Sequence, residues 1–124
     1  NNAERKDKGY SSAWLHHKGR NKHHYEYWMD YSAHSGQGII PAKMPKRYVI
    51  EMFIDRVAAS KNYNGKNYTD DMALKYYLSG DAGRYMHKDT RRMLEFLLRK
   101  LARDGEEQTM AYIRQHYCKR RNTF

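Results

Sequence analysis

Apolar residues recur at helical spacing in the second half of the chain. Positions three and four apart lie on one face of an α-helix, so this spacing predicts a helix with a buried stripe. A glycine at position 105 follows the last apolar position and supplies a stop signal. We therefore predict a helix over residues 88–104, whose apolar stripe consists of Met93, Leu94, Leu97, Leu98 and Leu101.

Two earlier segments also have the features of helices. Pro45 fits the first turn of a helix over residues 45–61. This segment is apolar on nearly every side, so we expect it at the centre of the fold. Thr69 provides a capping hydroxyl in front of two aspartates, which favour the positive end of a helix dipole. This combination predicts a helix over residues 69–78.

Helical signals also occur near both ends of the chain. Two glutamates open a last predicted helix over residues 106–119, with Met110, Ile113 and Tyr117 on one stripe. Near the start, a serine at position 11 or 12 can cap a short helix that runs to position 18 and that Gly19 ends. These two segments bring the number of predicted helices to five.

The rest of the chain carries no strand pattern. No run of alternating apolar and polar residues occurs, so the sequence predicts an all-α fold of roughly five helices in a compact single domain over residues 1–124. The backbone state of residues 20–31 is ambiguous, because rings and histidines crowd that segment. We expect loops or turns over residues 32–44, 62–68 and 79–85, and a polar lead-in over residues 1–10.

Composition narrows the class of protein. The chain has 124 residues, the size of one domain, and 24 Lys and Arg against 14 Asp and Glu give a formal charge of +10. The basic excess is scattered, and only residues 119–121 form a run of three. Its simplest interpretation is a solvated basic surface, which attracts polyanions and phosphorylated small molecules alike.

Several kinds of protein are excluded by simple features of the sequence. The longest apolar stretch, residues 48–54, is interrupted by Glu51 and is far too short to span a membrane. The single cysteine, Cys118, permits no internal disulfide and fits a reducing compartment, so we expect a cytoplasmic protein. A glycine-rich phosphate loop, an HExxH motif and the Glu-x-x-His motif of ferritin-like sites are all absent from the sequence.

The histidines are the most suggestive chemical feature. Four of the seven fall within nine residues, as two doublets on either side of a Gly-Arg-Asn-Lys turn. Imidazole is the commonest metal ligand in proteins, so the doublets can converge on one ion. The alternative is a basic surface segment whose histidines pack against neighbouring rings, and the two interpretations stand about even. The candidate ligands are His16, His17, His23 and His24.

Asp55 is the second candidate ligand. It lies in the middle of a predicted helix between apolar residues, where an unpaired buried carboxylate costs several kcal/mol. We therefore expect it to have a partner, either a metal ion or a cation in a structural ion pair. Glu51, one turn earlier, shares its face and can hydrogen-bond a ligating histidine. For the structural ion pair, the cation would come from Arg56, Lys18, Arg20 or another basic side chain.

Two blocks of the sequence carry a resemblance that spans the chain. AERKDKGYSSAWLHHKGRNKHHYEYWMDY and KMPKRYVIEMFIDRVAASKNYNGKNYTD resemble an uncharacterised bacterial family that automated naming often labels "catalase". That family is similar to the HD-domain metal-dependent phosphohydrolases, which are all-helical. Catalase chemistry itself is not expected, because haem catalases are much larger and the di-manganese signature is absent from this sequence.

The resemblance implies a ligand set and a reaction. The metal ligands of the HD-domain family follow the order His, His-Asp, His, His, Asp along the chain. Both histidine doublets match histidines of this order, and Asp55 matches its last aspartate. The His-Asp dipeptide of the order is absent from these 124 residues. Because the chain also starts with Asn, we expect it to be the C-terminal portion of a longer protein, lacking the N-terminal helices of the HD fold.

Metal chemistry then suggests the mechanism. A divalent ion (Mn, Fe, Co, Ni or Zn) lowers the pKa of bound water and polarises a phosphoryl oxygen of a phosphorylated small molecule. Lys18, Arg20 and Lys22 can offset phosphate charge, with Glu51 assisting.

A non-enzymatic function is the competing hypothesis. Twelve tyrosines and two tryptophans, interspersed with basic residues, can stack on and attract single-stranded nucleic acid. The residues nearest to such a pattern are Tyr25, Tyr27, Trp28, Lys22 and the basic run at 119–121. A third option is a scaffold that forms a homodimer through an exposed apolar face.

Overall fold

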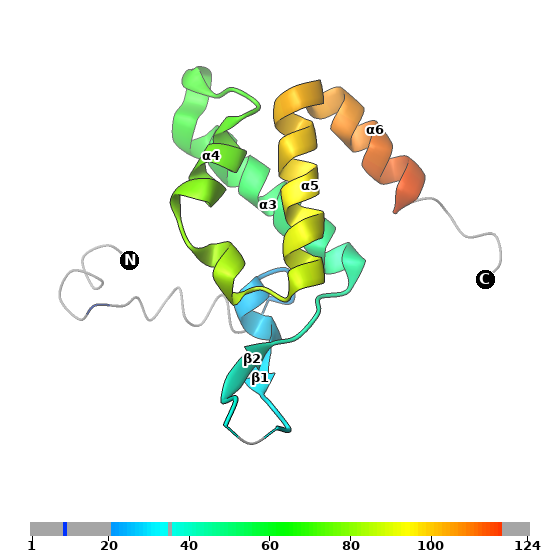
Figure 1. The fold of residues 1–124 in the computed structure, drawn as a ribbon. Helices are drawn as coiled ribbons and strands as arrows, with labels where there is room; N and C mark the ends of the chain where they lie inside the picture. The colour runs from blue at the N-terminus through cyan, green and yellow to red at the C-terminus, as the bar shows by residue number, and fades with distance from the viewer. Residues whose placement is uncertain (1–8, 10–20, 35, 118–124) are drawn as a thin grey trace.

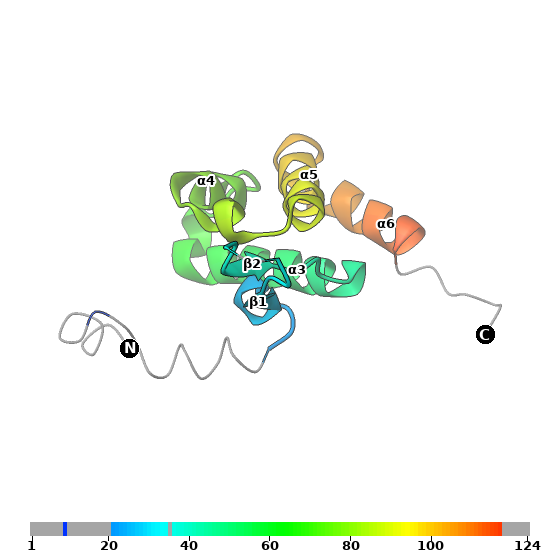
Figure 2. The ribbon, with the colours of Figure 1, turned by 60° about the horizontal axis from the view of Figure 1, so that its bottom comes forward.

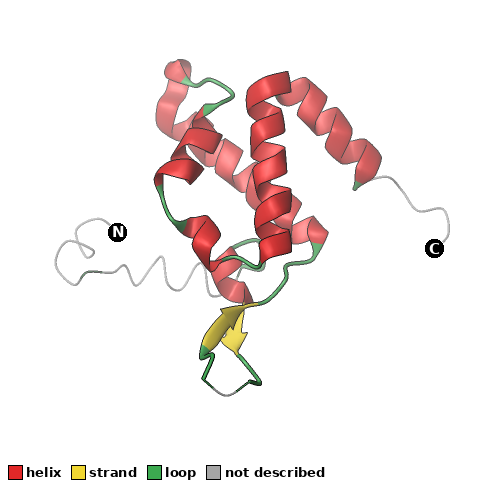
Figure 3. Ribbon diagram, viewed as in Figure 1, coloured by secondary structure: helices red, strands yellow, loops and turns green. Residues whose placement is uncertain are grey.

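The computed structural model describes residue 9, residues 21–34 and residues 36–117. Four α-helices form its main body, and a small hairpin extends from one end (Figures 1 and 3). The elements in chain order are η1 (Tyr25–Trp28), β1 (Met29–Tyr31), β2 (Ile39–Pro41), α3 (Lys46–Asn64), η2 (Gly65–Asn67), α4 (Met72–Ser79), η3 (Ala82–Tyr85), α5 (Lys88–Asp104) and α6 (Glu106–His116), where η denotes a 3₁₀ helix.

Helix α5 confirms the clearest sequence prediction. It spans Lys88–Asp104, and Gly105 ends it with a φ of 89° and an N–H bond to the Leu101 carbonyl. Four leucines of its predicted stripe are buried, while Met93 is partly buried at the edge of the core. The helix packs against α3, α4 and α6, so its stripe forms the middle of the hydrophobic core.

Helix α3 is central, as predicted, but it is not covered on every side. It crosses beneath α4 and α5, as Figure 2 shows, and buries Val49, Ile50, Met52, Phe53 and Val57 against them. The opposite face is only partly covered, and the side chains of Asp55 and of an isoleucine at position 54 are exposed there. The helix also runs three residues beyond the predicted end, to the glycine at position 65, whose φ of 56° stops it.

The boundaries of the other helices differ modestly from their predictions. Helix α4 begins at Met72 rather than Thr69, because the Thr69 hydroxyl bonds the Asp71 side chain instead of capping the helix. Helix α6 begins at Glu106 as predicted and is helical to His116. The short helix predicted over residues 11–18 lies outside the described residues.

A two-stranded hairpin corrects the all-α prediction to a mostly helical fold. Strands β1 and β2 pair antiparallel, with Met29 opposite Pro41 and Tyr31 opposite Ile39. Each strand has only three residues, too few for an alternating pattern to appear in the sequence. The hairpin leads into the core through Met44, which is buried and whose N–H bonds the Thr90 hydroxyl at 3.0 Å.

None of the helices in the described part of the chain has both the length and the apolar character of a membrane span.

Gly83 in η3 provides a stability test. A Cβ at this position would collide with the phenol oxygen of Tyr77, a buried residue whose hydroxyl donates to Glu95 at 2.7 Å. We expect Gly83→Ala to lower the free energy of unfolding by about 1–3 kcal/mol, as overpacking does. Gly80→Ala is the matched control, since nothing lies within 4 Å of its added Cβ. Both variants are measured by urea unfolding. Equal shifts of their unfolding midpoints would contradict this packing.

Candidate metal centre

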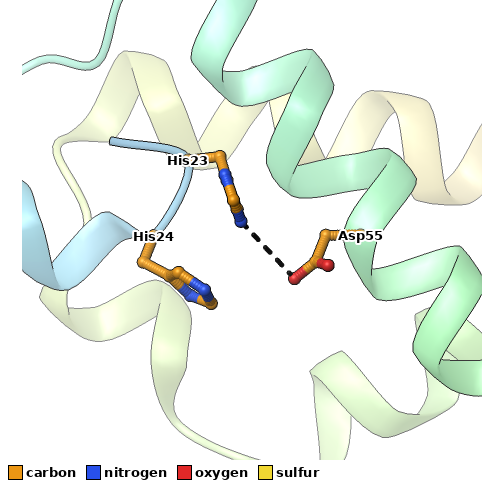
Figure 4. Close-up of side chains that lie close together, drawn as sticks. All are labelled: His23, His24 and Asp55. Atoms are coloured by element: carbon orange, nitrogen blue, oxygen red, sulfur yellow. Dashed lines mark ion pairs between the residues drawn. The ribbon is translucent and has the colours of Figure 1, made fainter. Parts of the chain in front are cut away.

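His23, His24 and Asp55 come together on the outer face of α3. The two histidines precede η1, and the aspartate projects from the middle of α3 toward them (Figure 4). One ligand atom from each side chain can be chosen so that all three lie within 4.8 Å of one another. Residues more than 30 positions apart in the sequence therefore form one polar cluster.

The turn before η1 places the two imidazoles side by side. His24 N–H donates to the carbonyl of Asn21 at 3.0 Å, and the His24 carbonyl accepts from Tyr27 N–H at 3.1 Å. His24 is buried, with only 9% of its surface exposed. The ring centroids of His23 and His24 are 4.6 Å apart. A backbone turn thus orients both rings, one of them in a buried position.

Two carboxylates one helical turn apart flank the His23 ring. Nδ1 of His23 lies 3.9 Å from Glu51 Oε1, and Nε2 lies 4.0 Å from Asp55 Oδ2. The two ring nitrogens of His23 therefore lie next to two different carboxylates. A metal-ligating histidine commonly directs its other nitrogen to a carboxylate, which fixes the orientation of the ring. Glu51 thus lies next to a candidate histidine ligand, but at 3.9 Å the two groups are beyond hydrogen-bond distance.

Asp55 itself is not buried, contrary to the reasoning from its apolar neighbours. Its side chain is 54% exposed, so burial does not force a partner on it. Within the described residues its ion-pairing neighbour is His23, whereas two of the cations considered as alternatives, Lys18 and Arg20, lie outside the described residues. Arg56 instead lies over the ring of Tyr77, 5.6 Å from the centroid. The cation of a structural ion pair is therefore not Arg56.

The ligand types of the cluster suit a divalent ion, and the spacing of its ligand atoms is slightly wider than such an ion requires. Imidazole and carboxylate ligands lie about 2.0–2.2 Å from such an ion, which places tetrahedral ligand atoms about 3.4 Å apart. The observed group is somewhat wider, and rotation of the exposed Asp55 side chain toward the rings would narrow it. Three protein ligands also leave a coordination position open, as catalytic zinc sites do.

The remaining predicted site residues are only partly placed. His16, His17, Lys18 and Arg20 lie outside the described residues, whereas Lys22 is exposed beside the cluster in sequence.

From the sequence, Tyr25 was expected to stack on a nucleic-acid base. In the structure it directly follows the two histidines and packs against the hydrophobic core. Burial raises the pKa of its phenol, and the neighbouring Glu26 carboxylate acts in the same direction, so the hydroxyl stays protonated at neutral pH.

The geometry therefore defines the class of protein as a mostly helical domain with a candidate metal centre. In comparison with known families, residues 1–100 match the family described as "Family of unknown function (DUF5662)". This match covers most of the chain, including the whole candidate centre, so the protein belongs to this family. No curated protein and no solved structure matches the chain.

Proposed function

We propose that this protein binds one divalent metal ion through His23, His24 and Asp55 and uses it to hydrolyse a phosphate ester. The observation that carries the proposal is the convergence of two imidazoles and one carboxylate from distant parts of the sequence. Glu51 adds to it, because its carboxylate lies 3.9 Å from the His23 nitrogen opposite to the one near Asp55, and a ligating histidine commonly has a carboxylate on that side.

The choice of reaction rests on charge and on the resemblance to the HD-domain phosphohydrolases. A divalent ion would polarise a phosphoryl oxygen and lower the pKa of bound water. The chain's formal charge of +10 raises the local concentration of phosphorylated substrates. Lys18, Arg20 and Lys22 precede or separate the histidines and are proposed to offset phosphate charge. The ligand types suit Mn, Fe, Co, Ni or Zn.

Glu51 is proposed as a positioning residue in this site. Its carboxylate faces the His23 nitrogen opposite to the one that faces Asp55, so it orients the ring without binding the ion. We expect Glu51→Gln to weaken metal binding about 10–100-fold, as changes behind a ligand do. Glu107→Gln is the matched control, an exposed first-turn glutamate of α6. Equal affinities of the two variants for Zn²⁺, measured by competition with a chelating dye, would remove this role.

Hydrolysis is tested with the full chain after removal of metal by a chelator. The stripped protein is assayed with p-nitrophenyl phosphate alone and after addition of each candidate ion. We expect activity only with a divalent ion, and loss of that activity in the double variant His23→Asn/His24→Asn. The double variant is compared with His34→Asn, which changes an exposed histidine in the hairpin loop. Activity that persists in the stripped protein would contradict the proposal.

A further inference from the structure

A groove between α3 and α4 is lined by residues of α3 that follow Asp55 and by residues of α4. It has a volume of about 830 Å³, within the range usual for small-molecule sites. Small side chains such as Ala59 and Ala73 line it together with larger residues. Among the described residues, no carboxylate lines this groove, whereas two cations do, Arg56 and Lys75. We call it the α3–α4 groove.

Two exposed tyrosines also line the groove. Tyr63, near the end of α3, is 90% exposed, and Tyr76 of α4 is 76% exposed. A tyrosine ring with this exposure has a face available for a ligand. Of the three rings that the sequence associated with nucleic acid, Tyr25 and Trp28 pack against the core, and Tyr27 is 41% exposed. Two of the most exposed aromatic side chains in the described part of the chain therefore line the α3–α4 groove.

The two cations of the groove differ in their ion-pair partners. Lys75 Nζ is 2.9 Å from Asp71, so its charge is shared with that carboxylate. Arg56 lies over the face of Tyr77 and has no carboxylate within ion-pair distance in the described part of the chain. Arg56 precedes Tyr63 by seven residues on α3, a distance of about 10 Å along the helix axis. The groove therefore has a cationic part and an aromatic part.

We propose that the α3–α4 groove binds nucleotides, with the base on Tyr63 and Tyr76 and the phosphate at Arg56. A nucleotide has a flat base that stacks on tyrosine and an anionic phosphate that pairs with a guanidinium. It can therefore contact the aromatic part and the cationic part of the groove together. The small side chains leave room for the ring, and the absence of lining carboxylates removes repulsion of the phosphate. This site is independent of the metal centre, since none of its lining residues is a proposed metal ligand.

The binding test uses the full chain in excess chelator and isothermal titration calorimetry. The probes are AMP, adenosine, which lacks the phosphate, and ribose 5-phosphate, which lacks the base. We expect AMP to bind at least about tenfold more tightly than either fragment. TMP and a ten-residue oligo(dT) identify the source of the nucleotide. Tighter binding of the oligomer indicates a single strand, and equal affinities indicate a free nucleotide.

Matched variants separate this groove from the general basic surface. Tyr76→Ala should weaken AMP binding at least about fivefold, and Tyr31→Ala should not, although both side chains are 76% exposed. Arg56→Gln should weaken binding more than Arg99→Gln, which makes the same charge change at an exposed position outside the groove. Thermal unfolding confirms that each variant is folded.

Three results would overturn the nucleotide site: no binding of AMP or oligo(dT), equal affinity for AMP and ribose 5-phosphate, or equal losses in the tyrosine variant and its control. The titration is made in excess chelator, so the metal centre holds no ion during it. Failure of the metal centre would therefore not affect this test.

Discussion

Phe53→Ala is expected to lower the free energy of unfolding by about 3–5 kcal/mol. Phe53 is fully buried on the inner face of α3, the face that packs against α5. Truncation removes a ring from a core whose other elements cannot close over the space. A natural domain is stable by only about 5–15 kcal/mol, so this one change would remove a large part of the total.

Phe96→Ala is the matched control, because it makes the same truncation on α5 at a side chain that is 43% exposed. Phe96 contacts the ring of Tyr112, with centroids 5.3 Å apart, so we expect a loss of about 1 kcal/mol. Chemical denaturation, monitored by circular dichroism, measures the free energy of unfolding of both variants. Similar losses for the two variants would show that α3 is not the centre of the core.

Asp55→Asn is expected to weaken divalent metal binding more than about 100-fold. The substitution keeps the shape of the side chain but removes the anionic oxygen that faces His23, which is 4.0 Å away. The loss should exceed the 10–100-fold effect typical of groups that only support a ligand. Because the side chain is 54% exposed, the free energy of unfolding without metal should change by no more than about 0.5 kcal/mol.

Metal affinity of this variant is measured by Zn²⁺ competition with a chelating dye. Asp30→Asn is the control, since Asp30 is an exposed aspartate in β1 that belongs to no metal-ligating group in the described part of the chain. Wild-type affinity in Asp55→Asn would eliminate this residue as a ligand, whereas an equal loss in both variants would indicate a general effect of surface charge.

The parts of the fold that were predictable have local signals. Helix α5 has both a clear stripe and a glycine stop, so its bounds were predicted correctly. The hairpin has neither, because three-residue strands are held mainly by their pairing with each other, a relation that local periodicity does not encode. The start of α4 was wrong for a similar reason: the hydroxyl of Thr69 had a nearby side-chain partner that competes with the capping role.

The candidate site was predicted in part, and one residue for an incorrect reason. The doublet His23–His24 was singled out by its density of imidazoles, and the structure brings it close to Asp55. Asp55 was expected to be buried, yet successive helix residues are 100° apart, so position 55 faces away from Phe53 and Val57. The apolar composition of α3 did not indicate which face other helices would cover, since that depends on α4 and α5 packing from elsewhere in the chain.

The α3–α4 groove was not predicted from the sequence. Tyr63 was assigned to a turn and Tyr76 to the interior of another helix, and nothing local relates the two. Their common position on one groove arises from the packing of α3 against α4. Exposure of a tyrosine ring is likewise a property of tertiary structure, because the same residue type is buried at Tyr77.

The central claim is that His23 and His24 bind one metal ion together with Asp55. NMR of the histidine side chains during titration of the full chain with Zn²⁺ tests it most directly. We expect the resonances of His23 and His24 to shift together and to saturate at one equivalent, while those of His34 and His116 stay in place. Unchanged His23 and His24 resonances, or uniform shifts of all the histidines without saturation, would contradict the claim.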